Sequence, residues 1–151
     1  MSITSAAPAR SSTSSHPNTP RVLRHGVLAG VVALPVIEAY VALAKAAGVR
    51  FKAGLPGART ASQVTAGSFA LGIVIATSWG TVLCVILARH ASRPTRTFTI
   101  IAVAGTALSL ITPLGAFGAS LGTRLTLAVG HLIVAGIMTT ILRRGLSHPQ
   151  S

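Results

Sequence analysis

Four long apolar segments dominate the pattern of hydrophobic and polar positions along the chain. They cover residues 26–44, 64–88, 98–121 and 125–142, and Glu38 is the only Asp, Glu, Lys or Arg within them. At 1.5 Å per residue a helix over each segment would be about 27–37 Å long, close to the ~30 Å hydrocarbon core of a bilayer. Because backbone groups find no water at that depth, each segment must be helical. The pattern predicts an all-α fold, a bundle of four transmembrane helices.

The polar segments divide the rest of the chain. Residues 1–20 are rich in Ser, Thr and Pro, and together with residues 147–151 they are expected to be disordered ends of a membrane domain over residues 21–146. The three connectors are residues 45–63, 89–97 and 122–124. The last is so short that the third and fourth helices should be antiparallel neighbours.

Composition and charge agree with a membrane protein. Half of the residues are hydrophobic and only 9% are charged, against about 25% charged in soluble domains. With a mean hydropathy of +0.69, these figures exclude a soluble enzyme, a disordered tail protein and a coiled coil. Thirteen Lys and Arg against one acidic residue give a net charge of +12.

The basic residues predict the orientation in the membrane. The side with both termini would carry eight Lys or Arg and the opposite side five: Arg10, Arg21, Arg24, Arg89, Arg93, Arg96, Arg143 and Arg144 against Lys45, Arg50, Lys52, Arg59 and Arg124. This favours cytoplasmic termini in a multi-pass protein of the plasma membrane. The expected partners are the bilayer and its anionic headgroups. Attraction to these headgroups contributes about 1 kcal/mol of binding free energy for each Lys or Arg near the membrane surface. Nucleic acid is not expected, because the charges are split over two faces without interleaved aromatic residues.

Several motifs in the second half are familiar. They are Ser78-Trp79-Gly80, Arg93-Pro94-Thr95-Arg96-Thr97-Phe98-Thr99, Leu108-Ser109-Leu110-Ile111-Thr112-Pro113-Leu114, Thr123-Arg124-Leu125 and His131-Leu132. With them the chain resembles, over about residues 21–142, a family of actinobacterial four-helix membrane proteins known as a domain of unknown function. The resemblance implies the topology and assigns no activity.

Glu38 and His131 are the candidates for proton or substrate binding. Placing an ionisable side chain inside a membrane helix costs about 3 kcal/mol of free energy, so such a residue is by default a candidate for a functional role. Glu38 lies six residues before Ala44 and His131 six residues after Leu125, so both should lie about 9 Å below the same surface. They could share a proton if they meet. Alternatively, Glu38 is neutral or pairs with Lys45, and His131 bonds a backbone carbonyl.

Small residues and one proline predict how the helices pack. Gly26 and Gly30 form one small-residue step, and Ser68, Gly72, Ala76 and Gly80 form a longer ladder. Such residues let helix backbones approach closely in lipid, within one chain or between two chains. Thr112 and Pro113 should kink the third helix, since proline removes a backbone hydrogen bond, and Ser109 or Thr112 could satisfy the freed carbonyl.

No catalytic or metal site can be assembled from this sequence. One acidic residue excludes a carboxylate pair, Cys84 has no credible base, and a metal site needs three or more ligands. We therefore expect no cofactor and a non-catalytic structural or accessory bundle that associates with itself or with another membrane protein. The alternative is a small proton-coupled transporter that uses Glu38, since the layout and the order Glu38, Lys45, Gly48 resemble the small multidrug-resistance exporters.

Overall fold

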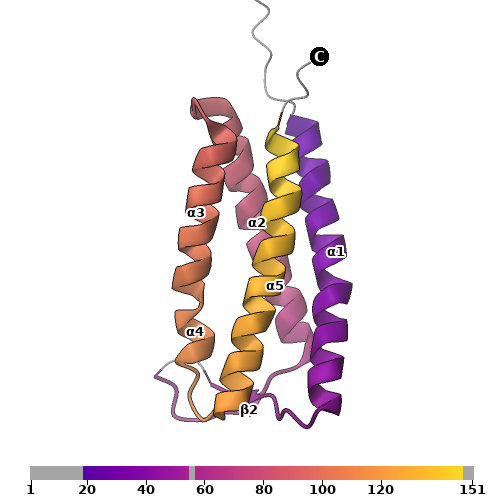
Figure 1. Ribbon diagram of the computed structural model, residues 1–151, viewed down its shortest axis with the longest axis vertical. Helices are drawn as coiled ribbons and strands as arrows, with labels where there is room; N and C mark the ends of the chain where they lie inside the picture. The colour runs from indigo at the N-terminus through magenta and orange to yellow at the C-terminus, as the bar shows by residue number, and fades with distance from the viewer. Residues whose placement is uncertain (1–18, 55–56, 148–151) are drawn as a thin grey trace, which may run out of the picture.

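The computed structural model describes residues 19–54 and 57–147, and it is a bundle of long helices (Figure 1). The elements are α1 (Thr19–Ala46), β1 (Lys52–Ala53), β2 (Ser62–Gln63), α2 (Ala66–His90), α3 (Pro94–Ser109), α4 (Ile111–Leu114) and α5 (Leu121–Leu146). Four spans are long and apolar enough to cross a membrane, with α3 and α4 together forming one of them. The predicted all-α fold is confirmed, with four helical spans that are long and apolar enough to cross a membrane.

The first and last helices of the chain, α1 and α5, extend beyond the predicted apolar segments. Helix α1 begins at Thr19 instead of residue 26, and α5 continues to Leu146 instead of residue 142. Hydropathy marks only the part of a helix that suits lipid, whereas the polar turns outside the hydrocarbon core keep their helical hydrogen bonds. The start of α1 and the end of α5 lie at the same end of the bundle, here called the terminal end (Figure 1). Disorder was predicted for residues 1–20 and 147–151; this is wrong for residues 19 and 20, which form the first turn of α1. Residues 1–18 and 148–151 lie outside the described residues.

The third span breaks where the proline was expected to act, and it ends at Leu114 rather than at residue 121. Pro113 has no N–H to donate to the carbonyl of Ser109. The helix is interrupted at Leu110, the residue after Ser109. The Ser109 hydroxyl donates to the carbonyl of Thr106 at 2.8 Å and not to the one that Pro113 frees. Residues 115–120 then form a loop between α4 and α5.

The long connector between α1 and α2 folds into a small cap at the other end of the bundle, here called the cap end. Strands β1 and β2 pair antiparallel. Gly54, just after β1, exchanges two backbone hydrogen bonds of 2.9 and 3.0 Å with Phe117 in the α4–α5 loop. A Cβ at Gly54 would lie 2.5 Å from the carbonyl oxygen of Thr60, so the turn accepts only glycine there. The cap therefore ties the two loops of this end together.

A seam of glycines against threonines joins α1 to α2. A Cβ added at Gly26 would clash with the Oγ1 of Thr81, and one added at Gly30 would lie 3.4 Å from the Oγ1 of Thr77. The two pairs have the same four-residue spacing on antiparallel helices, so each threonine fills the space that a glycine leaves. The small-residue step of the first helix thus lies at a contact within the chain.

Helix α5 holds the bundle together from the other side. It packs against α1, α2, α3 and α4. Tyr40 of α1 donates its hydroxyl hydrogen to the carbonyl of Thr126 at 3.0 Å, and Gly130 gives room for the side chain of Ile37. One buried cluster lies toward the terminal end and another toward the cap end: Val22, Cys84, Phe98, Leu142 and Leu146; then Ala33, Ile37, Val41, Phe51 and Ile73.

Candidate binding cavity

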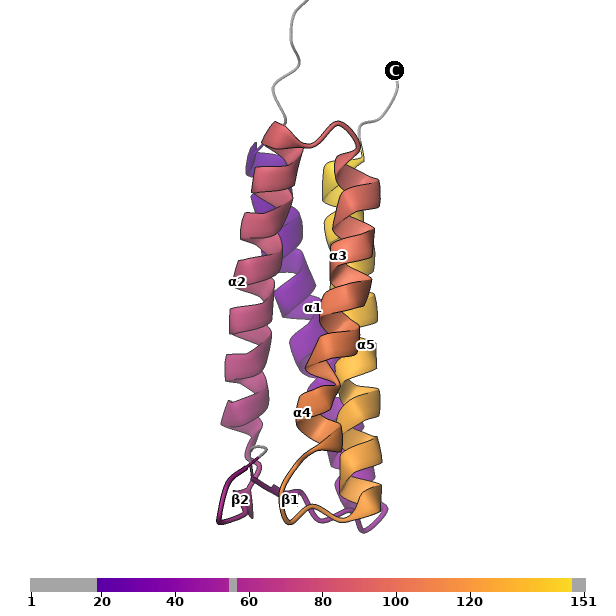
Figure 2. The same cartoon turned by 90° about the vertical axis from the view of Figure 1, so that its left-hand side faces the viewer.

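Helices α2 and α3 are joined by a short connector at the terminal end (Figure 2). Toward the cap end α2 passes behind α5 toward α1, while α3 and α4 stay on the other side of α5 (Figure 1). Between α2 and α3 lies a cavity of about 650 Å³, whose walls come from these two helices and whose floor comes from α5 with a few residues of α1. Its volume falls in the range of about 300–1,000 Å³ that is usual for small-molecule sites. The lining is almost entirely apolar.

Small residues create the space on both walls. Ser68, Gly72, Ala76 and Gly80 of α2 line the cavity, and Gly105 lines it from α3. A Cβ added at Gly72 or Gly105 would meet no atom within 4 Å. Of the three glycines on these two walls, only Gly80 is close to another helix, since a Cβ added there would lie 3.0 Å from the Cδ1 of Leu142 on α5. The ladder that we expected at a helix seam therefore faces an open space over most of its length.

Aromatic side chains line both ends of the cavity. Phe98 lies toward the terminal end and is 3% exposed. Phe51 and Phe69 lie toward the cap end, with their rings edge to face and the centroids 6.2 Å apart. Trp79 also lines the cavity and is 73% exposed.

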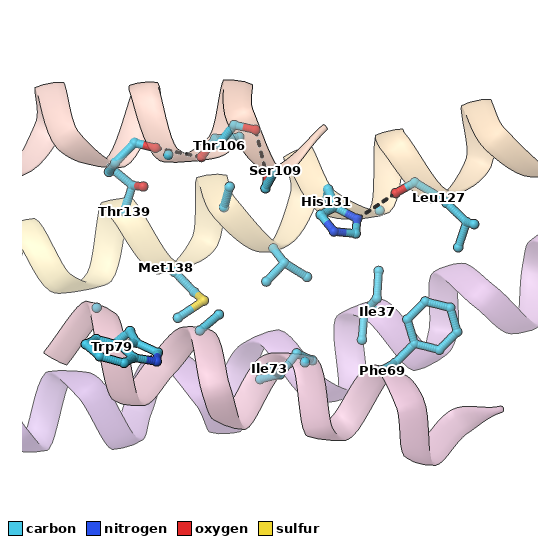
Figure 3. Close-up of a pocket in the computed structure, with 18 of the residues that line it drawn as sticks. Ile37, Phe69, Ile73, Trp79, Thr106, Ser109, Leu127, His131, Met138 and Thr139 are labelled. Atoms are coloured by element: carbon cyan, nitrogen blue, oxygen red, sulfur yellow. Dashed lines mark hydrogen bonds between the residues drawn. The ribbon is translucent and has the colours of Figure 1, made fainter. Parts of the chain in front are cut away.

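His131 is one of three polar residues that α5 contributes to the lining, with Thr126 and Thr139, and its ring reaches into the cavity (Figure 3). Its Nδ1 lies 3.0 Å from the carbonyl oxygen of Leu127, one turn earlier on the same helix. A carbonyl can only accept, so in this bond Nδ1 carries the proton and donates it. This is the backbone bond that the alternative interpretation of His131 expects. Its Nε2 is left free to face a guest.

Glu38 lies elsewhere. It is half-buried on α1, one residue after Ile37, and it does not line the cavity. Within residues 19–54 and 57–147 it forms no ion pair of 4.0 Å or less, either with His131 or with Lys45. The structure therefore does not bring the two predicted candidates together, although both belong to the cap-end half of the bundle. A similar depth along the two helices is not sufficient for contact, since His131 lines the cavity and Glu38 does not.

The remaining candidates form no reactive site in the described part of the chain. No group of three or more His, Cys, Asp or Glu is placed to hold a metal ion there. Cys84 is a free thiol, fully buried among apolar side chains of the terminal-end cluster. The arrangement can bind an apolar molecule by shape and offer it one nitrogen acceptor. Sequence reasoning missed this cavity: the ladder of small residues lines one wall of it, but the same ladder is equally typical of a close contact between two helices.

Comparison with known proteins gives one match. Residues 17–148 match the model of a protein family that is described as "Family of unknown function (DUF6069)". No curated protein and no solved structure matches the chain.

Proposed function

This chain belongs to the family of unknown function DUF6069, and on that premise we propose that it is a non-catalytic accessory protein of the membrane whose cavity binds a lipid-like molecule. The observation that carries the proposal is the apolar cavity of about 650 Å³ between α2 and α3. It lies within the spans that are apolar enough to cross a membrane. A molecule in the surrounding lipid could move into it without passing through water.

A small molecule suits the cavity better than a partner helix. A helix with its side chains is about 10–12 Å wide and needs an open groove along the full ~30 Å of the hydrocarbon core. On α5 the lining runs only from Thr126 to Leu142, about 24 Å at 1.5 Å per residue, with Phe98 toward one end and Phe51 toward the other. A flexible chain or a compact apolar body fits between these aromatic residues.

The remaining features of the proposal come from the charges. The terminal end carries most of the Arg residues, which supports cytoplasmic termini, a plasma-membrane location and contact with anionic headgroups. The motifs shared with the actinobacterial family support an origin of that kind. Association with a second copy or with another membrane protein would use the outer faces of the bundle, which expose many large apolar side chains.

Proton-coupled transport is the second candidate, and one observation favours it. The carboxyl group of Glu38 lies on a membrane-spanning helix and has no ion-pair partner among the described residues. An unpaired acid at such a position is often functional. Transport would have to use a path other than the cavity, because Glu38 does not line it.

Photolabelling with a phospholipid that carries a diazirine in one acyl chain tests the binding proposal. We expect labelled peptides from the cavity faces of α2, α3 and α5. In Gly72→Leu the new side chain points into the cavity, where a Cβ meets no atom within 4 Å. Displacing two methylene groups of the guest costs about 1.6 kcal/mol, so cavity labelling should fall about tenfold.

Gly136→Leu is the matched control. Gly136 is an exposed glycine of α5 that does not line the cavity, and a Cβ there also meets no atom within 4 Å. This variant should label like the parent protein. Equal labelling of both variants, or labels confined to the outer faces of the helices, would refute the proposal.

A further inference from the structure

Four of the six hydroxyl groups that line the cavity have already used their hydrogens. Each of four donates to a backbone carbonyl, three of them on the donor's own helix: Tyr40 to Thr126, Thr106 to Ala102, Ser109 to Thr106, and Thr126 to Gly122, at 2.7–3.0 Å. A hydroxyl that donates its single hydrogen keeps only lone pairs for another partner. These four groups can therefore accept a hydrogen bond from a guest but cannot give one.

His131 adds a further hydrogen-bond acceptor, which is stronger than the hydroxyl oxygens. Its Nδ1 hydrogen is held by the carbonyl of Leu127. In the neutral imidazole the other nitrogen, Nε2, then carries a lone pair and no hydrogen. Figure 3 shows the ring reaching from α5 into the space opposite Ile37 and Ile73, with Ser109 on the neighbouring helix. The part of the cavity around His131 is thus rich in acceptors.

Donors and charges are located elsewhere. No Lys, Arg, Asp or Glu of the described residues lines the cavity. Ser68 shares a hydrogen bond of 3.2 Å with the hydroxyl of Thr65, in which either group can donate. Thr139 and the indole N–H of Trp79 lie toward the terminal end of the cavity, away from His131 (Figure 3). A carboxylate or phosphate near His131 would face lone pairs and no compensating charge, and a buried charge without a partner is strongly unfavourable. A group that donates a hydrogen bond would be favoured there instead.

We propose that the guest is an uncharged lipid alcohol whose hydroxyl donates a hydrogen bond to Nε2 of His131, while its apolar body fills the space beside Gly72 and Gly105. This inference rests on the proposed function, because it specifies the class of molecule that the cavity would bind. An alcohol satisfies the acceptor at His131, and its hydrocarbon part matches the apolar lining. An alkyl ether of the same shape can fill the cavity but cannot donate.

The test compares octadecanol with octadecyl methyl ether as competitors of the photoreactive phospholipid, using the purified full-length protein in detergent. One net hydrogen bond corresponds to about a two- to tenfold difference in affinity. The parent protein should therefore bind the alcohol about fivefold more tightly than the ether. Octadecanoate, which is charged, should compete less well than the alcohol.

Variants of His131 assign the preference to this side chain. Since His131 is exposed to the cavity, its replacement should leave the fold intact. In His131→Leu the alcohol and the ether should bind equally, and in His131→Gln, which retains an acceptor, part of the preference should return. A parent protein that binds both competitors equally, or a preference that persists in His131→Leu, would overturn this inference and leave the lipid-binding function standing. Binding of neither competitor, with no cavity labelling, would overturn both.

Discussion

Replacing Gly26 by alanine tests the seam between α1 and α2. A Cβ at this position would clash with the Oγ1 of Thr81, and it would lie 3.0 Å from its Cγ2 and 3.1 Å from its Cβ. Rotation of the Thr81 side chain can move Oγ1 and Cγ2, but its Cβ is fixed to the backbone. The two helices must therefore separate by a few tenths of an ångström, and overpacking of this kind costs about 1–3 kcal/mol.

Two other glycines separate this packing effect from helix propensity, because every Gly→Ala change gains about the same propensity, up to about 1 kcal/mol. In Gly30→Ala the nearest atom, the Oγ1 of Thr77, is 3.4 Å from the new Cβ, which is an ordinary contact. In Gly136→Ala nothing lies within 4 Å. We expect Gly26→Ala to be about 1–3 kcal/mol less stable than Gly136→Ala. The free energy of unfolding of Gly30→Ala should be close to that of Gly136→Ala.

The assay is reversible unfolding in mixed micelles of a mild detergent and increasing dodecyl sulfate, followed by circular dichroism. Combining Gly26→Ala with Thr81→Ala removes the clashing atoms, so the double variant should recover stability, with a coupling of about 1 kcal/mol or more between the two sites. The close approach of α1 and α2 would be refuted if Gly26→Ala unfolded at the same dodecyl sulfate fraction as Gly136→Ala.

Three further predictions concern a buried hydroxyl, the membrane acid and the orientation. The Oγ1 of Thr77 is buried without a hydrogen-bond partner among the described residues, so Thr77→Val should raise the free energy of unfolding by about 1 kcal/mol; a loss of stability would mean that the hydroxyl has a partner. If the protein is an accessory binder, adding hydrophobic cations should release no protons from the parent or from Glu38→Gln; release by the parent that is absent in Glu38→Gln would establish transport instead. A reporter fused after residue 151 should be active in the cytoplasm, and activity outside the cell would reverse the proposed orientation.

The sequence predicted the number of spans well because lipid imposes a simple rule on composition. Every backbone group in the hydrocarbon core must bond within its own helix, and this requires long apolar segments that are easy to recognise. The ends of the helices were harder to predict, since the turns at Arg21 and Arg143 are helical but polar. The kink was predicted at Thr112 and Pro113, and the helix is interrupted three residues before Pro113, at Leu110. The loop that follows Leu114 was not predicted, because residues 115–120 are as apolar as a helix.

The cavity could not be predicted because it depends on the distance between two helices. A run of small residues such as Gly72 and Ala76 permits a close approach but does not require it. At Gly26 the space is filled by a threonine of the neighbouring helix, and at Gly72 it stays open. The direction of Glu38 relative to His131 likewise depends on how α1 and α5 are rotated about their axes, which spacing along the chain does not determine.

The contacts of α5 bear on the order in which the protein is made. This helix is the last of the described elements to leave the ribosome, yet it supplies the floor of the cavity and contacts α1, α2, α3 and α4. Until it inserts, Tyr40 lacks the carbonyl of Thr126 as its acceptor. A nascent chain that stops before α5 would thus hold a paired α1 and α2 and an α3 that lacks its contacts with α5, a form that membrane proteases could recognise as unfinished.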